Sequence, residues 1–216
     1  MSFKETMLSN SIENLIWLLK NQRHFKNWKK RNFNPPAPEF IKHEVLKKNN
    51  LKNCLWIESG TYYGDTTSEL SKISNKVISI EADDRLSKLA IKRFETIENV
   101  EIILGKSEDL FKNILKKNYL YKNICIYLDA HLCQDHLINK KTFGNEETGT
   151  PIKIELEVIE SEKNNFNNIN LLIDDIRLFD ANFQNYPSKN YLVDWCKKNN
   201  FKWEILHDIF VAKYTR

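Results

Sequence analysis

A chain of 216 residues, of which 41% are hydrophobic and 29% are charged, has the composition of an ordinary globular protein and is long enough to bury a full core. The net charge is only +4 and Lys residues are spread along the chain, so no nucleic-acid partner is expected, although residues 24–31 are basic and aromatic. No apolar run reaches the length of a membrane span and no signal-peptide pattern is present, so a cytoplasmic protein without a membrane span is expected.

The N-terminal part is predicted to form an arm, and the remainder a single α/β domain. Residues 1–50 hold a helical pattern and then a linker with three prolines in the run 35–38, which ends any helix. Residues 51–216 form the domain. The arm would either cover the main core as an amphipathic helix or border the functional site, as a cap or as the contact surface of a homodimer.

From residue 53 onward, the hydrophobic pattern alternates between strands and helices. Such alternation predicts right-handed crossovers and a mainly parallel, doubly wound sheet. The last two strands are joined by His207 and Asp208 alone, so they must form an antiparallel hairpin. We expect strands at 53–58, 76–81, 100–104, 123–128, 169–173, 201–206 and 208–214, and helices at 65–74, 83–95, 107–118, 151–163 and 188–199.

The stretch 55–67 predicts a strand, a tight turn and a helix N-terminus. Gly60 and Gly64 allow the backbone to approach a ligand closely or to adopt positive φ. Glu58 would repel a pyrophosphate but attract an amino group. Glu81, 21 residues after Gly60, is placed to accept hydrogen bonds from ribose hydroxyls. Because the turn is GxxxG rather than GxGxxG, these features favour S-adenosylmethionine over a dinucleotide.

Carboxylates follow most of the predicted parallel strands, and three of them are expected to converge. Asp129 ends one strand, and Asp174 and Asp175 end the next. A hard divalent cation such as Mg²⁺ or Ca²⁺ would relieve their mutual repulsion and leave positions open for substrate oxygens. In the alternative interpretation, Asp129 binds the amine of the cofactor, and the Asp pair caps the following loop or pairs with Arg177.

A histidine close to these acids is the candidate general base. His131 lies two residues beyond Asp129, where a strand gives way to a polar insert, and a side chain with a pKa near neutrality there could take a proton from a substrate hydroxyl. His136, within the same insert, is the second candidate. A polar loop residue without a catalytic role is the alternative for His131.

These motifs resemble a known family. The run Glu58-Ser-Gly-Thr-Tyr-Tyr-Gly-Asp-Thr66 resembles motif I of class I S-adenosylmethionine-dependent methyltransferases, Ser79-Ile-Glu81 their ribose-binding motif, and Gly105-Lys-Ser-Glu108 the loop beside adenine. The resemblance implies a Rossmann-like seven-stranded sheet in the order 3-2-1-4-5-7-6 with strand 7 antiparallel. It implies a cofactor site made of Glu58, Gly60, Thr61, Tyr62, Gly64, Thr66, Glu81, Ala82, Ser107, Glu108 and Asp129.

A narrower resemblance concerns the acceptor side of the site. The runs 127–131, 150–156 and 173–187 look like small bacterial methyltransferases associated with surface glycans, and the three acids are similar to those of macrocin-type sugar O-methyltransferases. This implies that Asp129, Asp174 and Asp175 hold Mg²⁺, and that Asp129 and His131 act in deprotonating an acceptor hydroxyl. The expected acceptor is a small molecule or glycan, such as a nucleotide sugar. The insert 131–150 departs from the narrower group because it lacks a glycine-rich run.

Two other classes of protein remain as alternatives. A nicotinamide-dependent sugar oxidoreductase or epimerase is disfavoured because the chain lacks GxGxxG and has no Tyr-x-x-x-Lys pair in the right region. A non-catalytic module that binds cofactor or glycan is disfavoured because it has no reason to keep the acids at the strand ends.

Overall fold

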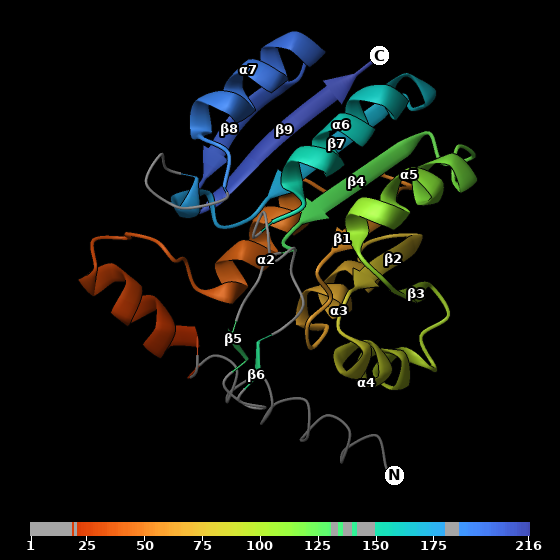
Figure 1. Cartoon of the computed structure of the whole chain (residues 1–216). Helices are drawn as coiled ribbons and strands as arrows, with labels where there is room; N and C mark the ends of the chain where they lie inside the picture. The colour runs from red at the N-terminus through yellow and green to blue at the C-terminus, as the bar shows by residue number, and fades with distance from the viewer. Residues whose placement is uncertain (1–18, 20, 131–133, 136–139, 142–149, 180–185) are drawn as a thin grey trace.

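The chain folds into a twisted sheet with helices on both faces (Figure 1). The computed structural model describes residues 19, 21–130, 134–135, 140–141, 150–179 and 186–216. The strands are β1 (Leu55–Ser59), β2 (Lys76–Glu81), β3 (Val100–Leu104), β4 (Asn123–Leu128), β7 (Asn168–Ile173), β8 (Lys202–Leu206) and β9 (Ile209–Thr215). The α-helices are α2 (Glu39–Lys48), α3 (Asp65–Ser71), α4 (Asp84–Phe94), α5 (Ser107–Lys117), α6 (Ile152–Glu162) and α7 (Lys189–Asn199).

The sheet has the predicted topology. Its strand order is β3-β2-β1-β4-β7-β9-β8, in which β9 is antiparallel to both of its neighbours and the other pairings are parallel. Counted within this sheet alone, the order is 3-2-1-4-5-7-6 with strand 7 antiparallel, so the predicted fold class is confirmed. The boundaries of the predicted strands and helices lie within three residues of those observed.

Three short elements were not predicted from the sequence. Two 3₁₀ helices, Lys163–Asn165 and Ile176–Leu178, follow α6 and β7. A two-stranded antiparallel hairpin, β5 (Gln134–Asp135) with β6 (Lys140–Lys141), lies within the insert 131–150. All three are too short to give a clear hydrophobic period.

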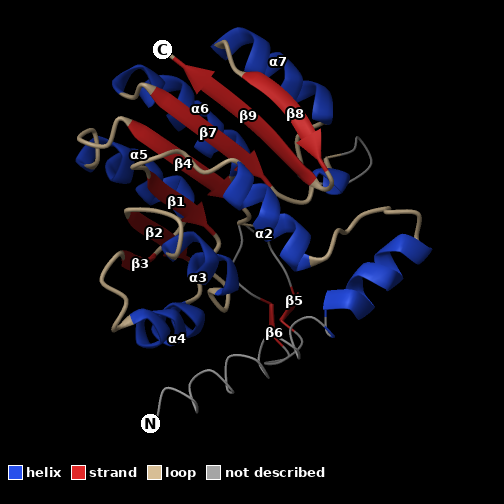
Figure 2. Cartoon of the chain, turned by 180° about the vertical axis from the view of Figure 1, so that it is seen from behind, coloured by secondary structure: helices blue, strands red, loops and turns tan. Residues whose placement is uncertain are grey.

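Alternating side chains divide the core between the two faces of the sheet. On one face, Ile124, Ile126 and Leu128 of β4 join the cluster that packs against α5, α6 and α7. On the opposite face, Cys125 and Tyr127 join the cluster under α2 and α3. Figure 1 views the sheet from the α5 and α6 side, and Figure 2 from the α2 and α3 side. Because both faces are covered, the central strands are buried along their whole length.

The described part of the N-terminal arm contacts the carboxyl edge of the sheet. Residues 21–30 are helical. Trp28, only 3% exposed, packs edge-on against His207 in the turn between β8 and β9, with ring centroids 5.2 Å apart. Its indole N–H donates to the backbone oxygen of Asn34 at 3.1 Å. Among the described residues, no helix combines the length and apolar character needed to cross a membrane.

Candidate active site at the carboxyl edge of the sheet

The turn after β1 requires glycine because it lies directly against the loop after β4. Gly60 has φ +93°, and its backbone N–H donates to the oxygen of Ile80 at 3.0 Å. A Cβ added at Gly60 would lie 2.9 Å from the backbone oxygen of Asp129, which is closer than real Cβ atoms approach. The two loops are therefore in contact at the central strands, where ligands bind in open α/β sheets.

Two further residues between β1 and α3 have a left-handed backbone conformation. Tyr62 has φ +52°, and Gly64 caps the helix with φ +82°. The backbone N–H of Tyr62 donates to the Glu81 carboxylate at 2.7 Å, and the N–H of Asp83 donates to its other oxygen at 2.9 Å. Burial raises the pKa of Glu81, while these backbone donors oppose the rise. Glu81 is thus fixed beside the turn by two backbone donors, and its ribose-binding role stays a prediction.

Glu58 is fully buried under this turn and ties it to β2 and α3. Its Oε2 accepts hydrogen bonds from the hydroxyls of Thr67 and Ser79, each at 2.5 Å. The hydroxyls of Ser79 and Thr61 lie 2.6 Å apart. The other oxygen, Oε1, has no hydrogen-bond partner among the described residues. Burial raises the pKa of Glu58 to about 7, against the two hydroxyl donors, so this carboxyl lacks a positively charged neighbour.

A second buried carboxyl lies on the opposite face of the sheet. Glu155 of α6 is 0% exposed and lies near the hydroxyls of Ser59 and Ser107. Burial raises its pKa to about 7. The sequence interpretation gave Glu155 no role because its neighbours in sequence form an ordinary apolar helix face. Ser107, a predicted cofactor residue, begins α5 and is 5% exposed.

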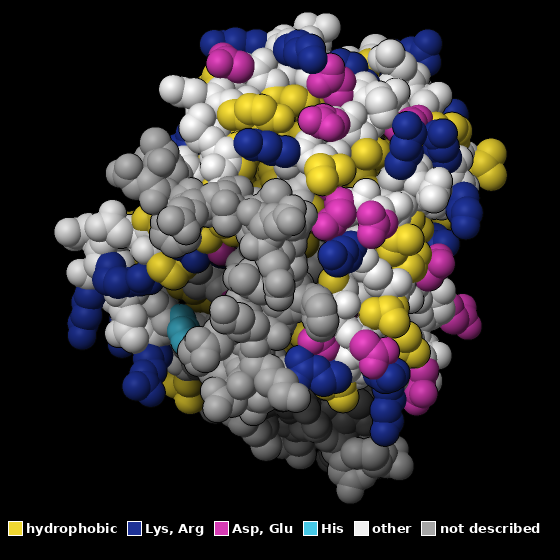
Figure 3. Space-filling view, viewed as in Figure 1, with side chains coloured by type: hydrophobic (Ala, Val, Ile, Leu, Met, Phe, Trp, Pro, Cys, Tyr) yellow, Lys and Arg dark blue, Asp and Glu magenta, His cyan; other side chains and the backbone are white. Residues whose placement is uncertain are grey.

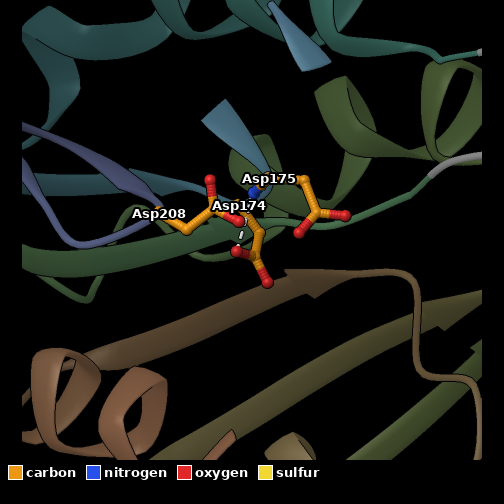
Figure 4. Close-up of side chains that lie close together, drawn as sticks. All are labelled: Asp174, Asp175 and Asp208. Carbon is orange, nitrogen blue, oxygen red and sulfur yellow. Dashed lines mark hydrogen bonds between the residues drawn. The ribbon is translucent and has the colours of Figure 1, made fainter. Parts of the chain in front are cut away.

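Three carboxylates gather at the ends of β7 and of the β8–β9 turn. Oxygen atoms of Asp174, Asp175 and Asp208 lie within 4.8 Å of one another (Figure 4). Asp175 has φ +54°, and its N–H donates to Oδ1 of Asp174 at 2.7 Å, the interaction drawn in Figure 4. This acidic cluster shares two residues with the predicted metal set and includes Asp208, which the sequence interpretation treated only as a hairpin connection.

Two basic side chains contact the acidic cluster. Lys42, from α2, places its Nζ 2.7 Å from Oδ2 of Asp174 and 3.0 Å from Oδ1 of Asp175. Arg177 contacts Asp175 at 2.5 Å and also pairs with Asp208. The expected alternative of a pairing with Arg177 is therefore observed for Asp175. Lys42 was missed because 132 residues separate it from Asp174.

The electrostatic environments of Asp175 and Asp129 differ. Although burial alone would raise it, the pKa of Asp175 is lowered because Lys42 and Arg177 lie beside it. The pKa of Asp129 is raised well above its usual range by burial and by repulsion from Asp174 and Asp175, and Lys42 offsets only part of this.

A divalent ion does not fit the acidic cluster as its residues lie. Each carboxylate already accepts a hydrogen bond from a cation or a backbone N–H. Oδ2 of Asp174 also accepts from the hydroxyl of Tyr127 at 2.5 Å. Binding Mg²⁺ at Asp174 and Asp175 would require Lys42 to leave.

The remaining predicted residues are distributed around this edge. Thr61 is buried, and Thr66, Ala82 and Glu108 are half-buried on α3, after β2 and on α5. The histidines proposed as base, His131 and His136, lie outside the described residues. Most of the predicted cofactor residues lie at or after the ends of β1, β2 and β4, whereas Ser107 and Glu108 begin α5, after β3. Their roles stay predictions.

Comparisons with known proteins concern the fold. No family model matches the sequence, and no curated protein is significantly similar to it. A Clostridium thermocellum protein provisionally named an rRNA methylase is similar with a TM-score of 0.54 at 13% identity, covering 81% of this chain and 95% of its own. A Streptococcus mutans protein provisionally named a methyltransferase, solved in complex with SAH, has a TM-score of 0.51 at 15% identity, covering 83% and 97%. Precorrin-6y C5,15-methyltransferase from Geobacter metallireducens has a TM-score of 0.50 at 8% identity, covering 81% and 87%.

The chain has the class I S-adenosylmethionine-dependent methyltransferase fold. In this methyltransferase fold, the glycine turn after β1 and the acid at the end of β2 occupy the positions that the sequence motifs predicted.

Replacing Gly60 by alanine is expected to destabilise the chain by roughly 1–3 kcal/mol, because a Cβ would meet the rigid backbone of Asp129 and the residue would remain at positive φ. Urea unfolding followed by circular dichroism measures this. Ser68→Ala on α3 is the matched control. A free energy of unfolding for Gly60→Ala within about 0.5 kcal/mol of the wild-type value would show that the two loops can move apart without loss of stability.

Replacing Glu155 by glutamine is expected to remove part of the pH dependence of stability. The pKa of Glu155 in the folded chain, about 7, lies above its ordinary value of 4.5, so wild-type stability falls as pH rises between these values, by up to on the order of 3 kcal/mol from this group. The stability of Glu155→Gln, measured relative to wild type at the same pH, should therefore be greater at pH 8 than at pH 5. Unfolding midpoints at both pH values measure it, with exposed Glu157→Gln as control. If the unfolding midpoints of the two variants changed equally between pH 5 and pH 8, the raised pKa of Glu155 would be contradicted.

Proposed function

We propose that this protein is an S-adenosylmethionine-dependent methyltransferase that methylates a hydroxyl of a small acceptor, such as a sugar or glycan precursor. The observation that carries the proposal is the glycine turn seated on the Asp129 backbone, with the buried carboxyl of Glu58 below it and Glu81 fixed beside it. This arrangement offers close backbone approach, a carboxyl that lacks a cation and an acid suited to ribose hydroxyls.

The chain's own groups would mainly bind and orient the reactants. Gly60 and Gly64 let the turn pack closely against the Asp129 backbone and the Phe94 ring. Glu58 and Asp129 are buried carboxyls with raised pKa values, and a cationic ligand would favour their ionised forms. S-adenosylmethionine, when bound, supplies an electrophilic methyl group on a sulfonium. Alignment of the acceptor oxygen with that methyl group, and removal of its proton, are then the main requirements. His131, with Asp129, remains the proposed base.

A hydroxyl-rich acceptor is supported by the chemistry of the acidic edge. Carboxylates accept hydrogen bonds from hydroxyl groups, and Asp129, Asp174 and Asp175 all follow the strands next to the proposed cofactor site. On the face shown in Figure 3, Lys and Arg side chains are interspersed with acidic ones on the right, while Lys and Arg side chains at the lower left have no acidic side chains among them. The predicted divalent ion is left out of this proposal because Lys42 and Arg177 already contact the acidic cluster.

The proposal is tested by calorimetric titration of S-adenosylmethionine and S-adenosylhomocysteine into the purified protein. Binding of both with micromolar affinity is expected, and an acceptor screen then compares nucleotide sugars and glycans with an RNA oligonucleotide. Transfer of labelled methyl to a sugar hydroxyl supports the full proposal, and transfer to RNA alone overturns its acceptor part. If neither cofactor binds while NADH does, the oxidoreductase alternative is favoured.

The affinity for S-adenosylhomocysteine is expected to rise as the pH increases from 6 to 8. The pKa of Glu58 is about 7 in the free protein, and a carboxylate that contacts the amine of the ligand must be ionised, so binding strengthens as this proton is lost. Titrations at pH 6, 7 and 8 measure the dependence. Glu58→Gln should bind several-fold more weakly at pH 8 and lose most of the pH dependence. An unchanged profile in this variant would remove Glu58 from the cofactor site.

A further inference from the structure

Lys42 is a buried cation that the predicted chemistry did not include. Only 15% of its side chain is exposed, although it comes from α2, outside the sheet. Two of its ammonium hydrogens contact Asp174 and Asp175. The third has no acceptor among the described residues. A lysine with one N–H to spare, held over the ends of β4 and β7, can offer that donor to a ligand.

The charges around the acidic cluster identify Lys42 as the cation that faces Asp174. Arg177 is already used by Asp175 and Asp208, whereas Asp174 pairs with Lys42 alone among the described basic residues. The acids in turn raise the pKa of Lys42 despite its burial, with contributions from Asp174, Asp175 and Asp129. The ammonium is therefore fixed beside Asp174 and Asp175 at the end of β7.

A lysine in this position can perform two tasks that a divalent ion would perform. It offsets the repulsion between converging carboxylates, and it presents positive charge toward a substrate oxygen. The ammonium is a compact point charge with three donors, so it can bind an oxygen while keeping both carboxylate contacts. Positive charge next to an acceptor hydroxyl also stabilises the alkoxide that develops when its proton is removed.

We propose that Lys42 binds the acceptor oxygen and takes the place of a divalent metal ion at this site. The acceptor part of the inference rests on the proposed function, whereas the exclusion of metal does not. A purely structural role for Lys42, in holding α2 against the sheet, predicts no specific rise in the KM for the acceptor in a folded Lys42→Met variant. The two roles are therefore separable by experiment.

The test is a Mn²⁺ titration followed by the electron paramagnetic resonance signal of the free ion. Wild-type protein is expected to leave the signal unchanged up to millimolar Mn²⁺. Lys42→Met removes the charge at nearly constant volume and should bind Mn²⁺ at least tenfold more tightly than wild type, because Asp174 and Asp175 then lack their cation. Lys47→Met removes an exposed ion-pairing lysine from the same helix and should behave as wild type.

Two outcomes would overturn the proposal: micromolar Mn²⁺ binding by the wild-type protein, or a folded Lys42→Met variant that gains no binding. Should Lys42→Met fail to fold, Lys42→Gln is titrated instead, and tight binding by the wild type overturns the proposal by itself.

A second measurement separates this inference from the proposed function. Lys42→Met should bind S-adenosylhomocysteine with an affinity within twofold of wild type. In the acceptor assay, the KM of this variant for the acceptor should rise at least tenfold. The wild-type protein should keep its activity when a chelator is present. Loss of wild-type activity in chelator overturns the exclusion of metal. Failure of the wild type to bind S-adenosylhomocysteine would count against the proposed function and not against the Mn²⁺ result.

Discussion

The convergence of carboxyl groups at one edge of a parallel sheet is the constraint on which the site depends. Because β1, β2, β4 and β7 run in the same direction, the acids at or directly after their ends, Glu58, Glu81, Asp129 and Asp174, lie around one edge. Buried carboxyls are costly unless they meet donors or cations. Much of the local structure at this edge supplies such partners.

The two halves of the edge meet this requirement differently. Near β1 and β2, hydroxyl groups and backbone N–H groups serve as donors, as Thr67 does for Glu58 and Tyr62 for Glu81. Near β7, full charges from Lys42 and Arg177 are used. The carboxyls of the first half are therefore held by neutral donors, and those of the second half by full positive charges. The proposed function assigns the cofactor to the first half and the acceptor to the second.

Local sequence patterns predicted the sheet, and they predicted that the glycine turn and Glu81 follow adjacent strands, because these residues are close in sequence or follow a strand. Hydrophobic period located the strands, and the spacing from Gly60 to Glu81 located two loops that do meet. The same patterns could not predict that Lys42 reaches Asp174, since only packing of α2 against the sheet brings them together. Glu155 was given no role for a related reason: its complete burial results from tertiary packing, which the local sequence does not show.

The contact between Gly60 and the Asp129 backbone also limits how this enzyme fold can be re-engineered. A side chain at position 60 would have to displace the Asp129 backbone, so the two loops cannot be altered independently, and swapping either one alone from another protein would disturb both. Changes at this edge are better sought on the exposed residues of α2, such as Glu44 and Lys47, because this helix packs on the sheet from outside (Figure 2). The glycine turn then acts as a fixed frame, and a single neighbouring helix as the variable part.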